Sequence, residues 1–531
     1  MRTITVRSAT ISILSIFLII LFVHFSSQPT SELKSSLKPQ FDHEDINAKQ
    51  SLDEKFMSFF PHGDFATQHE AVRNALRIAL ETNRTLILPQ VRLGKTWDWQ
   101  PFAILSKYYE SQDKQVLKTS CRLNQHNWMT NYQPCQQLNQ WIELPWSTFF
   151  NLDVLRKDFS IRIIERTSDH NWGTHDTLTP FLKPEQVIVL DPTSFASNGS
   201  DWETKTKINR DQSFFSRFFS STESASSQDE KDSLKLKTGL KNVIQSQDLT
   251  QISQRYIQFG SLVYGLRFLT NASQRQSALQ RALRSNVFVS PNQFHAVNQV
   301  SQTIVNALGG AGTYNCMHMT IGDLVKTELL NQISMKRENA AIERIKFVDD
   351  TKFSDDHGQP YNTTQLLNQL TPNAQLDLMT ALVRELNGDM PINQAVSVAL
   401  PLKNSLLRDL LSNPYTKNRQ SLLDACIDYR KAVDGRYPIY YLSNDIYKDI
   451  HQHLELFGPL VEAFPCMFTK NDMYILGLVD SDWAERIHGL NDLEVDYDDL
   501  LSIVVEILVA RKGYSFFEVP TTKLTRLLSW N

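Results

Sequence analysis

A cluster of polar residues between positions 309 and 323 is the part of this chain best suited to chemistry. His318, Thr320 and Asp323 gather at the carboxyl end of an apolar stretch, residues 314–319, that is typical of a short buried strand. In open α/β sheets, ligands bind outside the carboxyl ends of the strands. The segment therefore predicts a binding or catalytic site in an α/β fold.

A helix must lead into this strand. Val297, Ile304 and Val305 recur on one helical face, and Gly309 and Gly310 follow them, as glycines do past a helix C-terminus. The helix, the glycine turn and the strand would together present the polar residues at the edge of a sheet.

Two other segments have the same character. Gly63 supplies a permissive backbone before an amphipathic helix, and a strand follows at residues 86–88. The free N–H groups at such a helix start attract phosphate or sugar oxygens. Farther along the chain, a strand at residues 439–442 leads to the polar residues Asn444 and Asp445.

In this combination and order, the segments resemble the GDP-fucose protein O-fucosyltransferase family, especially its fungal-type members. That family carries a Pro-His-x-x-Phe-x-Asn-Gln loop, a Leu-Gly-Gly turn leading to His-x-Arg-x-Gly-Asp, and an Ala-Thr-Asp strand end. It also carries a Phe-Pro-Cys-x-Phe segment and a C-terminal Ser/Thr-Phe phosphate loop. This chain has related segments at residues 61–68, 308–323, 442–445, 464–468 and 520–524, and the resemblance covers roughly residues 56–531.

The resemblance implies two Rossmann-like domains facing a cleft, an architecture called GT-B, and transfer of fucose from GDP-fucose to a protein Ser/Thr hydroxyl. It implies no metal and no other cofactor. The residues that it places at the donor are Gly63, Phe65, Gln68, His318, Asp323, Asn444, Asp445, Thr521 and Thr522. Of these, Asn444 or Asp445 would accept a hydrogen bond from the guanine amino group, and the two threonines would donate to a phosphate.

The chain departs from the family where the leaving group is stabilised. The family's arginine is Thr320 here, its loop asparagine is Thr67, and Lys523 lies in its phosphate loop. A guanidinium is a permanent bidentate donor, and threonine cannot replace it. Losing one such donor typically costs on the order of 100-fold in rate. Either Lys523 substitutes, or the chain is a degenerate relative that binds a nucleotide sugar, a glycan or a protein without turnover.

A metal-dependent glycosyltransferase is a weaker alternative. Two Asp-x-Asp strings, at residues 480–482 and 496–498, could hold a divalent ion on a nucleotide diphosphate. Asp496 and Asp498 also directly precede an apolar helix at residues 498–512, where acidic side chains stabilise a helix N-terminus. Helix capping is the favoured interpretation of that pair.

The N-terminus predicts a location in the secretory pathway. Arg2 and Arg7 precede an apolar run at residues 9–25, which we interpret as a type II signal anchor with the folded part in the Golgi or endoplasmic reticulum lumen. A cleaved signal peptide is the alternative. Four glycosylation sequons agree with a luminal location: Asn83, Asn198, Asn271 and Asn362.

Five cysteines fit an oxidising compartment. Cys121 and Cys135 flank one polar loop and are predicted to pair, and Cys426 and Cys466 form the second predicted disulfide. Cys316 would remain free inside the buried strand.

The length of 531 residues suggests two or more domains, and the net charge of −4 argues against nucleic-acid binding. We expect an anchor (1–25), a luminal stem (26–55) and an N-terminal α/β domain (56–298) with a disordered insertion at 205–247. A C-terminal nucleotide-sugar-binding α/β domain would follow (299–531). The expected partners are a nucleotide sugar, a glycoprotein acceptor and, through the N-terminal helix, a membrane.

Overall fold

The computed structural model describes residues 54–97, 138–166, 186–191, 242–285, 288–321, 370–389, 416–444, 453–487 and 495–519, with short gaps, and a few single residues elsewhere. The predicted anchor and nearly all of the stem lie outside these residues. Within them, no helix is both long and apolar enough to cross a membrane.

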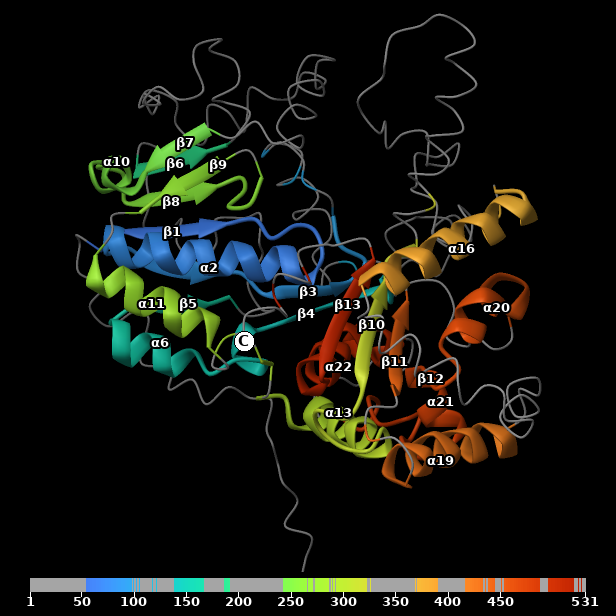
Figure 1. Cartoon of the computed structure of the whole chain (residues 1–531). Coiled ribbons are helices and arrows are strands. Elements are labelled where there is room, and N and C mark those ends of the chain that lie inside the picture. The colour runs from blue at the N-terminus through green and yellow to red at the C-terminus, as the bar shows by residue number, and fades with distance from the viewer. Residues whose placement is uncertain are drawn as a thin grey trace, which may run out of the picture.

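A five-stranded parallel sheet forms the first part of the fold (Figure 1). Its strand order is β5-β2-β1-β8-β6. The bounds are β1 (Phe56–Phe59), β2 (Thr85–Leu88), β5 (Ile163–Glu165), β6 (Val187–Leu190) and β8 (Tyr256–Phe259). On β2, Leu86 and Leu88 enter one buried cluster and Ile87 enters another, so the sheet is covered on both faces.

Helix α2 (Phe65–Thr82) covers one face of this sheet, beside α11 (Gln274–Arg284) and the short α10 (Ser246–Thr250). Its apolar side chains recur at helical spacing, and Val72, Ala75 and Leu76 are completely buried. The helix ends at Asn83 in the left-handed conformation, which asparagine tolerates. Helix α6 (Leu152–Phe159) leads into the edge strand β5.

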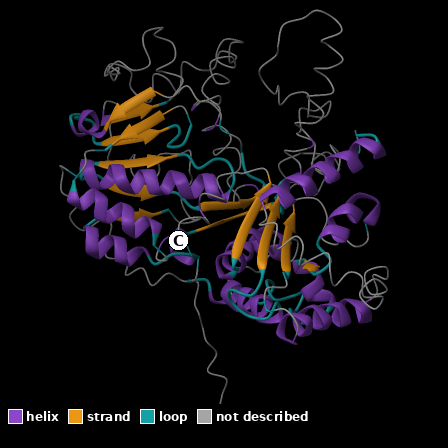
Figure 2. Ribbon diagram, viewed as in Figure 1, coloured by secondary structure: helices purple, strands orange, loops and turns teal. Residues whose placement is uncertain are grey.

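A four-stranded parallel sheet forms the second part, in the order β12-β11-β10-β13. The bounds are β10 (Asn315–Met319), β11 (Tyr440–Asn444), β12 (Met467–Phe468) and β13 (Ser515–Val519). Cys316 and Tyr441 face one buried cluster, while Met317 and Leu442 face another. Figure 2 shows the helices that flank these strands. The prediction of an α/β fold with parallel sheets is thus confirmed.

Helices cover both faces of the second sheet. One cluster of buried apolar side chains includes α13 (His295–Ala307), α19 (Thr416–Ala432), α21 (Lys470–Ile475) and α22 (Tyr497–Lys512). The other includes α16 (Pro372–Asp389) and α20 (Leu454–Ala463). Gly309 and Gly310, which end α13 as predicted, have φ angles of 99° and 105°, where a side chain would be strained.

Helix α19 is tied by two buried links to the segment that contains β12 and α21. The predicted disulfide Cys426–Cys466 is present, with a Cα–Cα distance of 6.0 Å. Arg419 also donates to the Asp472 carboxylate at 2.8 Å, and Asp472 in turn forms a capping box with Thr469 at the start of α21. The segment 464–468 therefore has a structural role in this chain.

The other cysteine and sequon predictions are tested only in part. Cys121 is disulfide-bonded, but Cys135 lies outside the described residues. Cys316 is free and buried, as predicted. Asn83 is exposed at the end of α2, whereas Asn198, Asn271 and Asn362 lie outside the described residues.

The predicted disordered insertion is too long at its C-terminal end. Residues 242–247 form β7 (Asn242–Gln245) and the first turn of α10, and β7 pairs in parallel with β9 (Leu266–Leu269). Ile244 is 1% exposed, and burial of this apolar side chain stabilises β7. Residues 205–241 lie outside the described residues.

The two sheets share one apolar core. A single cluster contains Met57 and Leu86 of the first sheet together with Cys316 and Tyr441 of the second. Helix α13, which contains the predicted boundary at residues 298–299, packs against α22. Strands β3 (Val91–Gly94) and β4 (Trp141–Leu144) form a two-stranded antiparallel sheet, and β3 contacts α22 as well. The 3₁₀ turn η2 (Trp146–Thr148) follows β4.

Gly94 marks the tightest point of this junction. Its φ is +83°, and a Cβ there would lie 2.2 Å from Leu500 Cδ2 on α22 and 2.3 Å from the backbone oxygen of Gln140. Because the backbone oxygen cannot move aside as a flexible side chain could, we expect Gly94→Ala to destabilise the fold by about 3 kcal/mol or more. Denaturant unfolding measures this loss.

Gly310→Ala is the matched control. Its φ of +105° imposes comparable backbone strain, but nothing lies within 4 Å of the added Cβ, so we expect a loss of only about 1–2 kcal/mol. Equal losses for the two variants would show that the junction at Gly94 is not tightly packed.

Candidate functional site at the carboxyl edge of the second sheet

The carboxyl ends of β10 and β11 bring two of the predicted segments together. In the parallel register, His318 lies opposite Ser443 and Met319 lies opposite Asn444. The Nδ1 atom of His318 and the hydroxyl of Ser443 are 2.9 Å apart and hydrogen-bonded, although 125 residues separate them in the chain. His318 is half-buried, and Thr320 is half-buried directly after the strand.

Strand order makes this edge a topological switch point. The chain passes from β10 to β11 on one side and later returns to β13 on the other side of β10. Connections that diverge in this way leave a crevice outside the carboxyl ends of the strands, where α/β proteins bind ligands. Val519, the last residue of β13, pairs with Met319, so the chain leaves β13 beside the predicted site.

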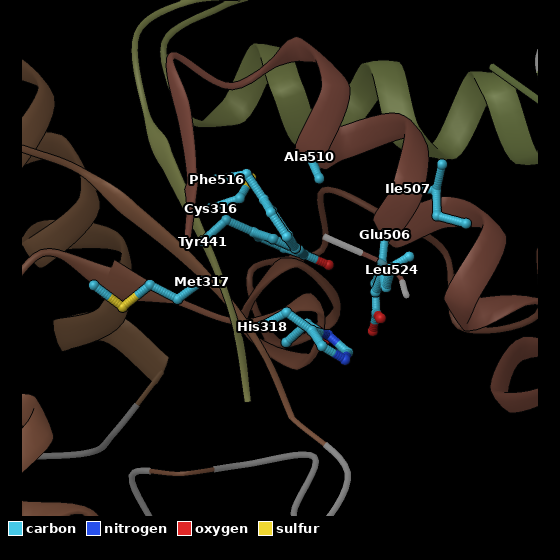
Figure 3. A pocket seen from close by; sticks show the side chains of 10 residues that line it. Cys316, Met317, His318, Tyr441, Glu506, Ile507, Ala510, Phe516 and Leu524 are labelled. Atoms are coloured by element: carbon cyan, nitrogen blue, oxygen red, sulfur yellow. The ribbon is translucent and has the colours of Figure 1, made fainter. Parts of the chain in front are cut away.

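A small pocket lies between this sheet and α22 (Figure 3). Its volume of about 10 Å³ is room for about one water molecule. A nucleotide therefore cannot enter it and would have to lie outside the edge. The lining residues are Cys316, Met317, His318, Tyr441, Ser443, Glu506, Ile507, Ala510, Phe516 and Leu524.

The pocket lining contains an acidic residue. Glu506 is the only Asp, Glu, Lys or Arg among the described residues that line it. Lys523 is the predicted replacement for the family's arginine, and it immediately precedes Leu524, which does line the pocket. Lys523 itself, with Asp323, Asp445, Thr521 and Thr522, lies outside the described residues.

The first predicted loop occupies the equivalent position in the first sheet. In the order β5-β2-β1-β8-β6, the chain passes from β1 to β2 and β5 on one side and later forms β6 and β8 on the other, so the switch point lies between β1 and β8. His62 follows β1 and Ser261 follows β8, and their side chains are hydrogen-bonded at 2.9 Å. Gly63 has a φ of +73°, which confirms that this turn uses glycine's backbone freedom.

The start of α2 differs from the expected open anion site. The Asp64 carboxylate accepts a hydrogen bond from the backbone N–H of Thr67 at 2.7 Å and caps the helix. A negative side chain in this position competes with a phosphate for the same N–H groups. The Asp64 carboxylate thus occupies one of the N–H groups that were expected to attract an anion.

Gln68 and Phe65 have structural roles. The Gln68 amide donates to the carbonyls of Gly63 and Arg92 and accepts from the N–H of Arg92, which locks the loop to β3. Phe65 is 4% exposed and packs against Trp146, with ring centroids 5.8 Å apart. Since both side chains are buried and engaged, any effect on a donor has to act through the position of the loop.

His69, one turn into the same helix, is a buried structural histidine. Its Nε2 lies 2.6 Å from the carbonyl of Phe288, and its ring stacks on that phenylalanine at 4.7 Å. Burial lowers the pKa of His69 to about 3, so the ring is neutral at physiological pH. It is not a candidate proton carrier.

The carboxylates of the second Asp-x-Asp string have structural roles. One carboxylate oxygen from each of Asp496, Asp498 and Asp499 lies within 4.8 Å of the other two. Asp496 caps α22 by accepting from the N–H of Asp499 at 3.1 Å. The Asp498 carboxylate accepts three hydrogen bonds, from Lys470 Nζ at 3.0 Å, Tyr474 Oη at 2.6 Å and Trp483 Nε1 at 2.8 Å.

Both Asp-x-Asp strings are thus engaged within the protein. Asp498 is already neutralised by a lysine, and in the other string Asp480 and Asp482 both pair with Arg486 on the surface. Helix capping and ion pairing account for these carboxylates.

Sequence reasoning missed three residues of this region: Tyr441, Ser443 and Glu506. Tyr441 and Ser443 alternate along β11 on the same face as Cys316 and His318 on β10. That alternation could be predicted from the sequence. The position of Glu506 opposite these strands could not, because it depends on how α22 packs against the sheet. Burial raises the pKa of the Cys316 thiol well above its usual range, so this cysteine is an inert core residue.

Comparisons with known proteins add little. No protein family model matches the sequence, and no curated protein matches it significantly. Two solved structures, both of POFUT1 in complex with GDP-fucose in different crystal forms, are similar with TM-scores of 0.30 and 0.29 and 10% identity. They cover 89% of this chain and 99% and 100% of their own chains. Scores this low identify neither shared residues nor shared chemistry.

Proposed function

We propose that this protein is a GT-B-type glycosyltransferase that moves fucose from GDP-fucose to a Ser/Thr hydroxyl of a protein, without a metal. One observation carries the proposal. The two segments predicted to bind the donor, ending at His318–Thr320 and at Ser443–Asn444, meet at the carboxyl edge of one parallel sheet, at its switch point.

The donor's guanine would bind at the end of β11. The Asn444 side-chain oxygen can accept a hydrogen bond from the guanine amino group, and Asp445 is the neighbouring alternative. His318, hydrogen-bonded to Ser443, would face the diphosphate or the sugar. Inverting transfer then requires an activated acceptor and a stabilised leaving group.

Stabilisation of the leaving group requires a cation at the diphosphate. Thr320 stands where the family has arginine, and no lysine or arginine is among the described residues that line the pocket. Lys523 would supply the charge, with Thr521 and Thr522 donating hydroxyls to a phosphate. Its place in the sequence, between Val519 at the sheet edge and Leu524 in the pocket lining, supports this role.

A binding module without turnover is the second candidate. Thr320 favours it, because a threonine at the position of the family's arginine leaves a departing diphosphate without that cation. The metal-dependent alternative is weaker, because Asp498 is already saturated by Lys470, Tyr474 and Trp483.

We also propose that the folded part lies in the Golgi or endoplasmic reticulum lumen behind a type II anchor at residues 9–25. The full-length protein should then stay with membranes after a carbonate wash and lose mass on deglycosylation. Asn83→Gln should remove one step of that mass shift, because Asn83 is exposed. A mature protein that begins after residue 25 would refute the anchor while leaving the luminal location intact.

Nucleotide choice tests the donor site. If Asn444 or Asp445 reads the guanine amino group, GDP should bind at least tenfold more tightly than UDP, a difference of about 1.4 kcal/mol. Calorimetry with the two nucleotides, with and without Mn²⁺, measures this. Asn444→Ala should narrow the difference if Asn444 is the reader, and Ser58→Ala, in the first sheet, should not. Tighter UDP binding would contradict the donor assignment, and an Mn²⁺ requirement would favour the metal-dependent alternative.

The missing arginine gives the sharpest test of turnover. Thr320→Arg should raise fucosyl transfer or GDP-fucose hydrolysis by on the order of 100-fold, because it restores the diphosphate donor. Thr320→Gln is the matched control, since it adds length without charge and should not raise the rate. Lys523→Ala should lower turnover strongly and Lys523→Arg should preserve it.

Each outcome separates the candidates. An inactive wild type that gains activity as Thr320→Arg is a degenerate transferase. An active wild type that is unaffected by Lys523→Ala has its cation elsewhere, and the role given to Lys523 is then wrong.

A further inference from the structure

The hydroxyl of Tyr441 has no hydrogen-bond partner among the described residues. The residue is 2% exposed, and it lines the pocket together with Glu506, Ile507 and Ala510 of α22. Figure 3 shows its hydroxyl end turned into the pocket behind His318. A buried hydroxyl without a partner is unfavourable, so its position calls for a polar group in that space.

Glu506 supplies a strong acceptor on the opposite wall. It projects from α22 into the same pocket, where its Oε1 accepts a hydrogen bond from the Ser502 hydroxyl at 3.1 Å. Burial, and then the Glu506 charge, raise the pKa of Tyr441 well above its usual range. The tyrosine therefore keeps its proton and acts as a donor, but it makes no direct bond to the carboxylate.

The space between these groups matches one small polar molecule. About 10 Å³ is room for about one water, and a buried water needs two to four polar partners. Tyr441, Glu506 and His318 all line the pocket, and each side chain carries a polar group that can serve as such a partner (Figure 3). The other ionisable group on this wall, the Cys316 thiol, keeps its proton and is a weak donor.

We propose that Tyr441 and Glu506 hold a buried water molecule in this pocket, and that the water positions the His318 ring from the α22 side. Ser443 already holds the ring through Nδ1 on the sheet side. Tyr441 and Glu506 are thus positioning residues, and only the role of His318 toward a donor rests on the proposed function.

The sign of one stability change tests the water. If the hydroxyl is idle, Tyr441→Phe removes a buried unpartnered group and raises the melting temperature. If it binds a water, Tyr441→Phe lowers the melting temperature by about 2 °C or more. Tyr314→Phe is the matched control, because the Tyr314 hydroxyl donates to the carbonyl of Val509 in α22 at 2.6 Å. It should lower the melting temperature similarly.

The ring of His318 provides the second measurement. In full-length protein labelled with ¹⁵N-histidine, Tyr441→Phe and Glu506→Gln should each change the His318 ring ¹⁵N shifts, which report the position of its proton. Tyr314→Phe should leave them unchanged. Glu506→Gln keeps a polar side chain of the same size, so it serves if Tyr441→Phe does not fold.

A melting temperature that rises in Tyr441→Phe, or His318 shifts that are the same in all variants, would overturn the inference. Neither measurement needs a nucleotide. The positioning device can therefore be confirmed even if GDP fails to bind and the proposed function is abandoned.

Discussion

Burial of helix α22 is the packing constraint on which the described structure depends. The helix is apolar around most of its circumference, and Leu501, Val504, Val505, Ile507 and Val509 are completely buried. It packs against the second sheet, against α13 and against β3 of the two-stranded antiparallel sheet. Burying five such side chains contributes on the order of 10 kcal/mol. One helix thereby holds together elements that are far apart in the chain.

The same helix gives the candidate site its inner wall. Tyr314 reaches across from the sheet to bond the carbonyl of Val509, and Ser301 of α13 contacts the carbonyl of Val505. These contacts fix the sheet against the helix at the level of the pocket. Glu506 is the exception on this apolar face, since a carboxylate at a sheet–helix interface has to find polar partners. Because Glu506 and His318 line the same pocket, the packing of α22 determines which groups surround His318.

The proposed function rests on some segments that fit the motifs and on others that depart from them. The turn at Gly63, the helix–glycine turn–strand unit before His318 and the polar end of β11 are all built as the motifs require. The electrostatic part is altered, because threonine replaces the arginine and the described lining of the pocket contains a glutamate.

The local elements of the fold follow from the amino-acid sequence. The strand at 315–319, the helix at 497–512 and the glycines that end α13 follow from periodicity and backbone preference within a few residues. Tertiary structure alone decided the rest. Long-range pairing, such as that of His318 with Ser443 across 125 residues, decides which side chains become neighbours. It decides whether Gln68 faces a ligand or bonds to β3, and whether Glu506 and Tyr441 line the same pocket. A local pattern cannot specify a neighbour that only strand order and helix packing bring into contact.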